Sequence, residues 1–213
     1  MIFRIPEDRK GIGGSLTPGI FIKSLQVFWA DCRLRSTAYV DMTTYFIFGA
    51  FETFLPLYLV SIGIEVYLIG IIFAIQVLSI ALTKPFFGKI ADVKNPVYQI
   101  MAGLMLLGLS VFMIPFCSDI MLLLILSLLS GLGMSLSTVA TTKYIADIAK
   151  REEIGASMGA LSSIMDVGHS SGPFVTGIII TASGYAAGFG MALILAVITT
   201  LYFGTMTIRS TKT

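Results

Sequence analysis

The position of the basic residues relative to the apolar stretches constrains this chain more than any other feature. The sequence divides into six long apolar stretches, and its 14 Lys and Arg residues fall before the first, around the second and fourth joins, and after the sixth. The first, third and fifth joins contain no basic residue. This alternation is the positive-inside pattern of a polytopic membrane protein, with every basic residue on one side of the membrane. It predicts that both termini are cytoplasmic.

The composition indicates that the chain folds in lipid rather than in water. Hydrophobic residues occupy 56% of the 213 positions and charged residues 12%, about half the charged share usual in soluble domains. A helix that spans a bilayer needs about 20 apolar residues, and each stretch provides them. We therefore expect an integral protein of the plasma membrane, with the lipid bilayer as its first partner. Nucleic acid is not expected as a partner, because the basic residues form no continuous face.

The sequence predicts neither a metal nor a cofactor. The two cysteines, Cys32 and Cys117, fall on opposite sides of the membrane in this topology, so they are not expected to pair. The sequence contains no metal-ligand spacing and no nucleotide-binding motif. We therefore expect an ion gradient to drive any transport.

The chain is expected to consist of a cytoplasmic segment (1–35), a six-helix transmembrane domain (36–208) and a cytoplasmic tail (209–213). The first segment has no apolar region directly behind a short basic start, so no cleavable signal peptide is predicted. Apolar residues recur at helical spacing between Phe21 and Trp29, which fits either an amphipathic helix on the membrane surface or a helix packed on the ends of the others. The expected spans are 37–60, 67–87, 97–116, 120–144, 154–182 and 185–207.

Ionisable residues are distributed unevenly over these spans. The third and sixth have none in their interiors, whereas the first contains Asp41 and Glu52 and the fifth contains Asp166 and His169. We therefore expect the third and sixth spans to face lipid and the others to face protein or water. The pattern repeats after three helices. Because three is odd, two consecutive three-helix units have opposite orientations, as in the inverted repeats of many transporters.

Two carboxylates on the first span are the leading candidates for contact with a substrate or for proton coupling. Asp41 and Glu52 are about three helical turns apart and so lie on nearly the same helix face. A carboxylate inside a bilayer is costly and usually faces a cavity with a function. Two structural alternatives remain open. Asp41 fits a hydrated residue near the helix start, and Glu52 fits a buried, hydrogen-bonded carboxyl.

Other polar residues inside the spans extend the set of candidates. Asp166 and His169 lie one turn apart on one face of the fifth span, as either a proton relay or a structural pair. Gln76 lies near the middle of the second span, and Thr138 belongs to a stripe of small polar residues on the fourth. We expect these four residues to be further contacts for a substrate or a proton.

The segment 168–172 matches the hydrolase pattern G-x-S-x-G. That motif requires a strand–turn–helix context to expose its serine. Here the segment lies inside a long apolar helix, and the only histidine of the chain lies within the motif itself. A membrane-embedded enzyme is therefore not expected.

Two glycine-containing segments indicate close packing and conformational change. Gly88 and Asp92 lie at the second join, where glycine permits a close backbone approach and Asp92 can accept hydrogen bonds from a helix N-terminus. Gly168, Gly172 and Pro173 combine small residues with a missing backbone donor on the fifth span. The second arrangement fits tight packing alone or a bendable seam at a moving interface.

Four of these segments carry a family resemblance: FETFLPLY at 51–58, KPFFGKIAD at 84–92, GASMG at 155–159 and DVGHSSGP at 166–173. Over 36–207 they resemble the C-terminal half of a major facilitator superfamily (MFS) transporter. Gly88 and Asp92 are similar to the family's G-x-x-x-D loop motif. The chain departs from that motif after Asp92, where Lys94 and Asn95 stand among the positions usually held by a glycine and paired basic residues.

The resemblance implies that the first and fourth spans line a central cavity, the second and fifth form a seam with another half, and the third and sixth face lipid. Family members normally have two six-helix halves with the small-molecule substrate between them. The resemblance therefore implies a partner half, either a separate chain or a second copy. The function expected from it is a half-length, alternating-access secondary transporter of a small solute. A non-transporting or truncated membrane protein with a regulatory or partner-binding role is the alternative.

Overall fold

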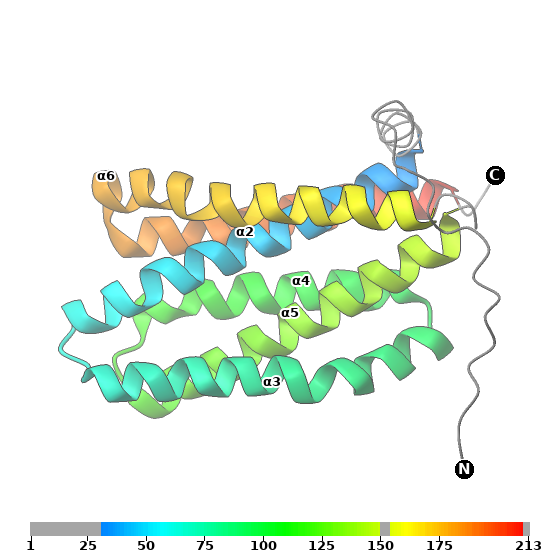
Figure 1. Cartoon of the computed structure of the whole chain (residues 1–213). Coiled ribbons are helices and arrows are strands. Elements are labelled where there is room, and N and C mark those ends of the chain that lie inside the picture. Colours follow the sequence, from blue (N-terminus) through cyan, green and yellow to red (C-terminus); the bar gives the residue numbers. More distant parts are fainter. Residues whose placement is uncertain (1–30, 150–153, 211–213) are drawn as a thin grey trace, which may run out of the picture.

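Long helices that run side by side make up the part of the chain that the structure describes, residues 31–149 and 154–210 (Figure 1). The expected amphipathic helix between Phe21 and Trp29 lies outside these residues, as do Lys150 and Arg151. In this computed structural model the elements are α2 (Cys32–Ser61), α3 (Val66–Val93), α4 (Pro96–Met113), the short 3-10 helix η1 (Ile114–Phe116), α5 (Ile120–Ile148) and α6 (Ile154–Ser210).

Within residues 31–149 and 154–210, five helices are long and apolar enough to cross a membrane. A helix can span lipid because its backbone satisfies its own hydrogen bonds. The five candidate spans are Cys32–Ser61, Val66–Val93, Pro96–Phe116, Ile120–Ile148 and Ser157–Thr207. The described residues form no strand. The prediction of an all-α membrane protein is therefore confirmed.

The helix α6 reverses direction at Gly184, so that it runs out along the bundle and back again (Figure 1). Gly184 has φ 83° and ψ 173°, a conformation that side chains other than glycine rarely adopt. A Cβ atom added at Gly188 would collide with the side chain of Ile180, which shows how closely the chain folds back. We call the part before Gly184 the first segment of α6 and the part after it the second segment. The turn expected at this glycine is present.

The start of α2 differs from the predicted domain boundary at residue 36. The Asp31 carboxylate accepts a hydrogen bond of 2.8 Å from the backbone N–H of Arg33, which caps the helix. Helix α2 consequently begins at Cys32, and the end of the expected cytoplasmic segment forms its first turn. The helix start is set by this cap rather than by the first run of apolar residues.

The helix α3 also extends beyond its predicted end. The prediction of a loop at 88–95 is therefore wrong for most of these residues, which are helical. Gly88 and Asp92 lie on the last turns of α3, which continues to Val93. The boundary falls here because Asn95 caps α4 and Pro96 occupies its first turn. A proline also disfavours the helical conformation of the residue before it. Similarly, α5 continues to Ile148 rather than ending at residue 144.

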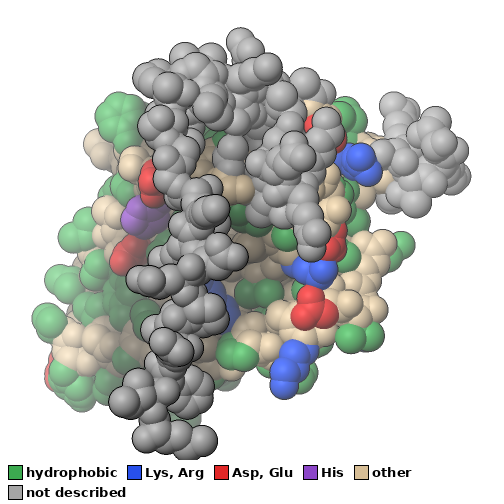
Figure 2. Space-filling model, turned by 45° about the vertical axis from the view of Figure 1, so that its right-hand side comes forward, with side chains coloured by type: hydrophobic (Ala, Val, Ile, Leu, Met, Phe, Trp, Pro, Cys, Tyr) green, Lys and Arg blue, Asp and Glu red, His purple; other side chains and the backbone are tan. Residues whose placement is uncertain are grey.

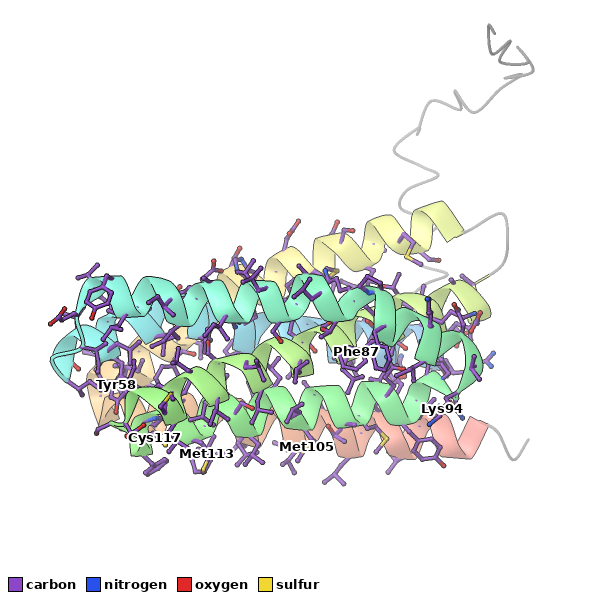
Figure 3. All side chains as sticks on the ribbon, turned by 90° about the horizontal axis from the view of Figure 1, so that it is seen from below. Tyr58, Phe87, Lys94, Met105, Met113 and Cys117 are labelled. Atoms are coloured by element: carbon purple, nitrogen blue, oxygen red, sulfur yellow. The ribbon has the colours of Figure 1, made fainter. Side chains whose placement is uncertain are left out.

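The two ends of the bundle are distinguished by the residues that lie there. Tyr58, Met113 and Cys117 lie at one end, and Phe87 and Lys94 lie at the other (Figure 3). At the first end, the Tyr58 hydroxyl donates to the Pro115 carbonyl at 3.1 Å. The helices thus cross the bundle in alternate directions. Cys32 and Cys117 lie at opposite ends, and both are free thiols.

Glycine contacts bring α2 and the first segment of α6 together along their length. A Cβ atom at Gly168 would collide with the Met42 carbonyl, and one at Gly172 with the Phe46 carbonyl. On α2, Gly49 meets the His169 carbonyl in the same way. The helix α6 continues through Pro173, so the missing backbone donor at this proline does not end the helix. The small residues of the fifth predicted span therefore pack backbone against backbone.

The helices α3 and α4 differ from expectation in how much of their surface is covered. In the most apolar window of each helix, 22% of residues are buried in α3 and 56% in α4. The third predicted span, α4, was expected to face lipid, and its outward residues Tyr98 and Leu109 are indeed apolar. Its other side packs tightly, because Gly103 meets the backbone of α5. The most exposed apolar helix is α3, the second predicted span.

Candidate functional site

A cavity of about 380 Å³ opens between α2, α3, α5 and the first segment of α6. It brings together four of the predicted site residues: Asp41, Gly88, Asp92 and Thr138. The remaining lining residues are Tyr45, Lys84, Val139, Thr142, Lys143, Ala146 and Met165. Residues of both charge signs therefore face one space that is bordered by four helical segments.

Asp41 lies on the inner wall of this cavity and is only 1% exposed. The Thr141 hydroxyl on α5 donates to the Asp41 carboxylate at 2.7 Å. One turn along α2, the hydroxyls of Thr44 and Ser137 are 3.2 Å apart. The interpretation of Asp41 as a hydrated residue at the helix start is therefore wrong. Asp31 caps the helix, and Asp41 is a buried link between α2 and α5.

Glu52 of α2 and His169 of the first segment of α6 lie within hydrogen-bond distance of each other. The His169 Nε2 and Glu52 Oε2 atoms are 3.1 Å apart, and the two side chains are 45% and 51% exposed. The Phe48 ring stacks on the imidazole with a centroid distance of 5.8 Å. The single histidine is visible at the surface with acidic side chains beside it (Figure 2). Of the alternative interpretation of Glu52, the burial is therefore wrong, whereas the hydrogen bond to another helix is present.

The partner of His169 also differs from the sequence-based hypothesis. Asp166 lies one turn away on the same helix, but the imidazole pairs with Glu52 of α2 instead. Asp166 is exposed, and it forms no ion pair with any residue in the described ranges. The sequence contains no signal for this choice, because it depends on how α2 and α6 pack.

Asp41 and Glu52 have different surroundings although they share a helix face by spacing. Helix α5 lies close to α2 around Asp41 and diverges toward α3 at the other end of the bundle (Figure 1). Glu52 consequently lacks the cover that Thr141 and its helix give to Asp41. The first carboxylate is enclosed by α5, and the second is covered on one side only, by His169 of α6.

A charged cluster at the mouth of the cavity was missed by the sequence analysis. The Lys143 ammonium on α5 is 2.5 Å from the Asp147 carboxylate and 3.8 Å from Asp92 on α3. The four-residue spacing of Lys143 and Asp147 is a signal that could have identified this pair. The contact with Asp92 required the extended α3 and could not be inferred from spacing.

Gln76 does not line the cavity. Its side chain is 1% exposed, and its Nε2 donates to the Ser130 hydroxyl of α5 at 3.3 Å. Nearby, Ser127 donates to the Ile72 carbonyl and Ser79 to the Leu128 carbonyl. These bonds hold α3 against α5. Gln76 is therefore placed as a structural residue, whereas Thr138 does line the cavity and donates within its own helix.

The described residues contain no group of three or more His, Cys, Asp and Glu side chains arranged to hold a metal ion. The polar groups present can instead bind a charged or polar solute, or carry a proton at Asp41, Glu52 or His169. Charged side chains within apolar spans are typical of polytopic membrane transporters.

The chain belongs to the Major Facilitator Superfamily, because the sequence model of that family matches residues 8–212. It is similar to an uncharacterized MFS-type transporter of Methanocaldococcus jannaschii, with 27% identity over 66% of this chain and 36% of the relative. It is 31% identical to the multidrug resistance protein MdtG of Rahnella sp., over 85% of this chain and 43% of the relative.

A third relative is the quinolone resistance protein NorA of Staphylococcus aureus, which is 28% identical over 58% of this chain and 32% of the relative. The chain spans less than half the length of these curated relatives. The first of these relatives is named as a transporter, and the other two are named as resistance proteins.

Proposed function

We propose that this chain is one six-helix half of a secondary transporter that moves a small solute by alternating access against a second six-helix half. The two segments of α6 count as separate spans in this proposal. The two repeat units are then α2–α4, and α5 with both segments of α6, in opposite orientations. The cytoplasmic parts are 1–35 and 209–213, and both termini face the cytoplasm of the plasma membrane.

The observation that carries the proposal is the exposure of the Glu52–His169 pair. Both residues lie well inside long apolar helices, yet each side chain is about half exposed. Ionisable groups at membrane depth face protein or a water-filled cavity, because contact with lipid is costly. The face that carries the pair therefore requires a cover that the described residues do not provide. A second half with water between the two halves is the cover that fits a carrier.

Substrate binding is assigned to the side of α2 and α5 that carries Glu52 and borders the cavity at Asp41. The names of two relatives, a multidrug and a quinolone resistance protein, favour an organic solute. Phe48, stacked on His169, offers such a solute an aromatic surface next to a charge. Glu52 and His169 are assigned to proton coupling, driven by an ion gradient. Asp166 and Thr138 are further candidate contacts.

The conformational role of the glycines belongs to the same proposal. Gly168 and Gly172 pack the first segment of α6 on α2, and with Pro173 they are assigned to the interface at which this packed pair moves against the second half. Asp92 joins α3 to Lys143 of α5 at the proposed cytoplasmic end, and Gly88 lies about one turn before it on α3. Alternating access requires contacts of this kind to form and break as the halves rock.

The test is transport by the chain purified from its native membrane with whatever partner accompanies it. In vesicles with an imposed proton gradient, we expect Glu52→Gln and His169→Gln to abolish the gradient-driven accumulation of the transported solute, while the protein stays folded. Glu65→Gln is the matched control, since Glu65 is an exposed acid in the join before α3. Unchanged accumulation in Glu52→Gln removes the coupling role. Absence of any second half or second copy in the purified complex contradicts the half-transporter proposal and favours a non-transporting protein.

A further inference from the structure

A second cavity lies on the other side of α2 from the charged one. It measures about 300 Å³ and is lined by Tyr39 of α2 and by Ile198, Thr199 and Tyr202 of the second segment of α6. Tyr39 and Asp41 are two positions apart on a helix, which places them on roughly opposite faces. The groove is thus separate from the proposed substrate site. We call it the α2–α6 groove.

The walls of the α2–α6 groove are suited to hydrocarbon. The rings of Tyr39 and Tyr202 meet edge to face at a centroid distance of 5.8 Å. The hydroxyl of Thr199, which lines the groove, lies 3.0 Å from the hydroxyl of Thr43 on α2, within hydrogen-bond distance. Ile198 is 58% exposed at the rim, and the neighbouring Leu201 is 63% exposed. An acyl chain in this groove would meet apolar and aromatic surface.

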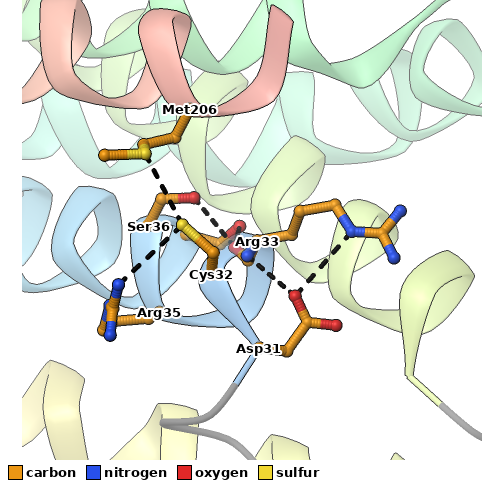
Figure 4. A network of polar contacts seen from close by, with 7 residues as sticks. Asp31, Cys32, Arg33, Arg35, Ser36 and Met206 are labelled. Atoms are coloured by element: carbon orange, nitrogen blue, oxygen red, sulfur yellow. Dashed lines mark hydrogen bonds and ion pairs between the residues drawn. The ribbon is translucent and has the colours of Figure 1, made fainter. Parts of the chain in front are cut away.

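A positive charge lies at one end of the α2–α6 groove. The Arg35 guanidinium, one helical turn before Tyr39, contacts the side chain of Tyr202 and lies 3.9 Å from the Cys32 sulfur. The four ion pairs found among residues 31–149 and 154–210 do not include Arg35. Its neighbour Arg33 points the other way and pairs with Asp31 at 3.8 Å (Figure 4). Arg35 therefore presents a cation whose charge no described carboxylate balances.

Arg35 and Tyr39 lie near one end of the helix α2, where the boundary between lipid headgroups and acyl chains is expected for a spanning helix. Helix α2 begins at Cys32, so Arg35 lies about 5 Å and Tyr39 about 10 Å from the helix start along its axis. Tyrosines are enriched at this level of a membrane, and basic groups between transmembrane helices bind anionic headgroups. The Cys32 thiol, which donates to the Met206 thioether at 3.5 Å, holds the two helices together beside the cation (Figure 4).

We infer that the α2–α6 groove binds an anionic phospholipid, with its phosphate on Arg35 and an acyl chain against Tyr39, Tyr202 and Ile198. Charge complementarity favours an anionic lipid over a neutral one, and the apolar groove favours a lipid over free phosphate. The inference requires only that the chain spans a bilayer, and it holds whether or not the chain transports a solute.

The test measures the association of spin-labelled phosphatidylglycerol with the purified full chain in phosphatidylcholine vesicles, by the motionally restricted fraction of the label. One basic group near a membrane surface contributes a preference of roughly fivefold for an anionic lipid. We expect this preference in the wild type, its loss in Arg35→Gln, and its retention in Arg33→Gln. Ile198→Trp fills the rim of the groove without touching the cation, and this variant is also expected to lose the preference for the anionic lipid.

Three results would overturn the inference. The first is equal association of phosphatidylglycerol and phosphatidylcholine with the wild type. The second is an equal loss in Arg33→Gln and Arg35→Gln, which indicates surface charge without a groove. The third is displacement of the label by soluble glycerol phosphate, which indicates a phosphate site that needs no acyl chain. Because Ile198 is an exposed residue, its variant keeps the test decisive if Arg35→Gln is poorly folded.

Discussion

The hydroxyl of Thr141 on α5 donates a 2.7 Å hydrogen bond to the carboxylate of Asp41 on α2. Both side chains are almost fully buried. The buried carboxylate therefore depends on a donor from a neighbouring helix, which has consequences for stability as well as for the cavity beside it.

Removal of that donor is expected to destabilise the fold. Thr141→Val keeps the shape of the side chain but leaves Asp41 without this bond, and an unsatisfied buried polar group costs about 1–3 kcal/mol. The measurement is the free energy of unfolding in mixed micelles, followed by loss of helical circular dichroism. The control is Thr142→Val, because Thr142 is exposed and donates within its own helix. Equal losses in the two variants would contradict the role given to the Asp41 bond.

The glycine contacts between α2 and α6 predict a sharp position dependence for alanine substitutions. In Gly172→Ala the new Cβ atom meets the Phe46 carbonyl, which belongs to the backbone and cannot rotate away. We expect a loss of about 1–3 kcal/mol, as for other overpacked sites. Gly159→Ala, with nothing within 4 Å of the new atom, is expected to gain roughly 0.5–1 kcal/mol through lower chain entropy. The same unfolding assay separates these outcomes, and a gain in Gly172→Ala would refute the close approach.

The turn inside α6 predicts a second kind of glycine dependence. Gly184 has space around it but a φ of 83° and a ψ of 173°. Gly184→Ala is therefore expected to cost about 1–3 kcal/mol through backbone strain rather than through collision. Gly70→Ala is the comparison, since Gly70 also has open space but lies in the regular helix α3. If the two variants have the same free energy of unfolding, the chain does not need a glycine at this reversal.

The proposed topology predicts that the joins at residues 63 and 94 face different compartments. Single cysteines are introduced as Gly63→Cys and Lys94→Cys after Cys32 and Cys117 are replaced by serine. An impermeant maleimide added outside intact cells is expected to label residue 63 only, and residue 94 only after the membrane is opened. Labelling of both residues from outside would contradict the assigned orientation.

The all-helical class of the chain and several helix boundaries could be predicted from the residues of each segment. The reversal at Gly184 falls between the expected spans 154–182 and 185–207, and α5 begins at Ile120, as predicted. The errors arose where a stronger signal was nearby. Gly88 was interpreted as a helix end, whereas Pro96 and the Asn95 cap place the boundary after Val93.

The arrangement of the candidate site was less accessible to sequence reasoning. Spacing along α2 placed Asp41 and Glu52 on one face, but their surroundings are decided by the crossing of α5 over α2. Spacing along α6 brought Asp166 near His169, but the imidazole binds Glu52 of another helix. Periodicity describes one helix at a time, and these contacts depend on the angle between two.

The placement of α2 against both segments of α6 has a mechanical consequence. On one side Gly49 meets the backbone of His169, and on the other the Thr43 hydroxyl lies 3.0 Å from that of Thr199. Helix α2 is thus held by the first segment of α6 on one side and by the second segment on the other. We therefore expect these three helical segments to tilt as a unit. In the proposed transport cycle, a movement of α2 at Glu52 would then also displace the second segment of α6.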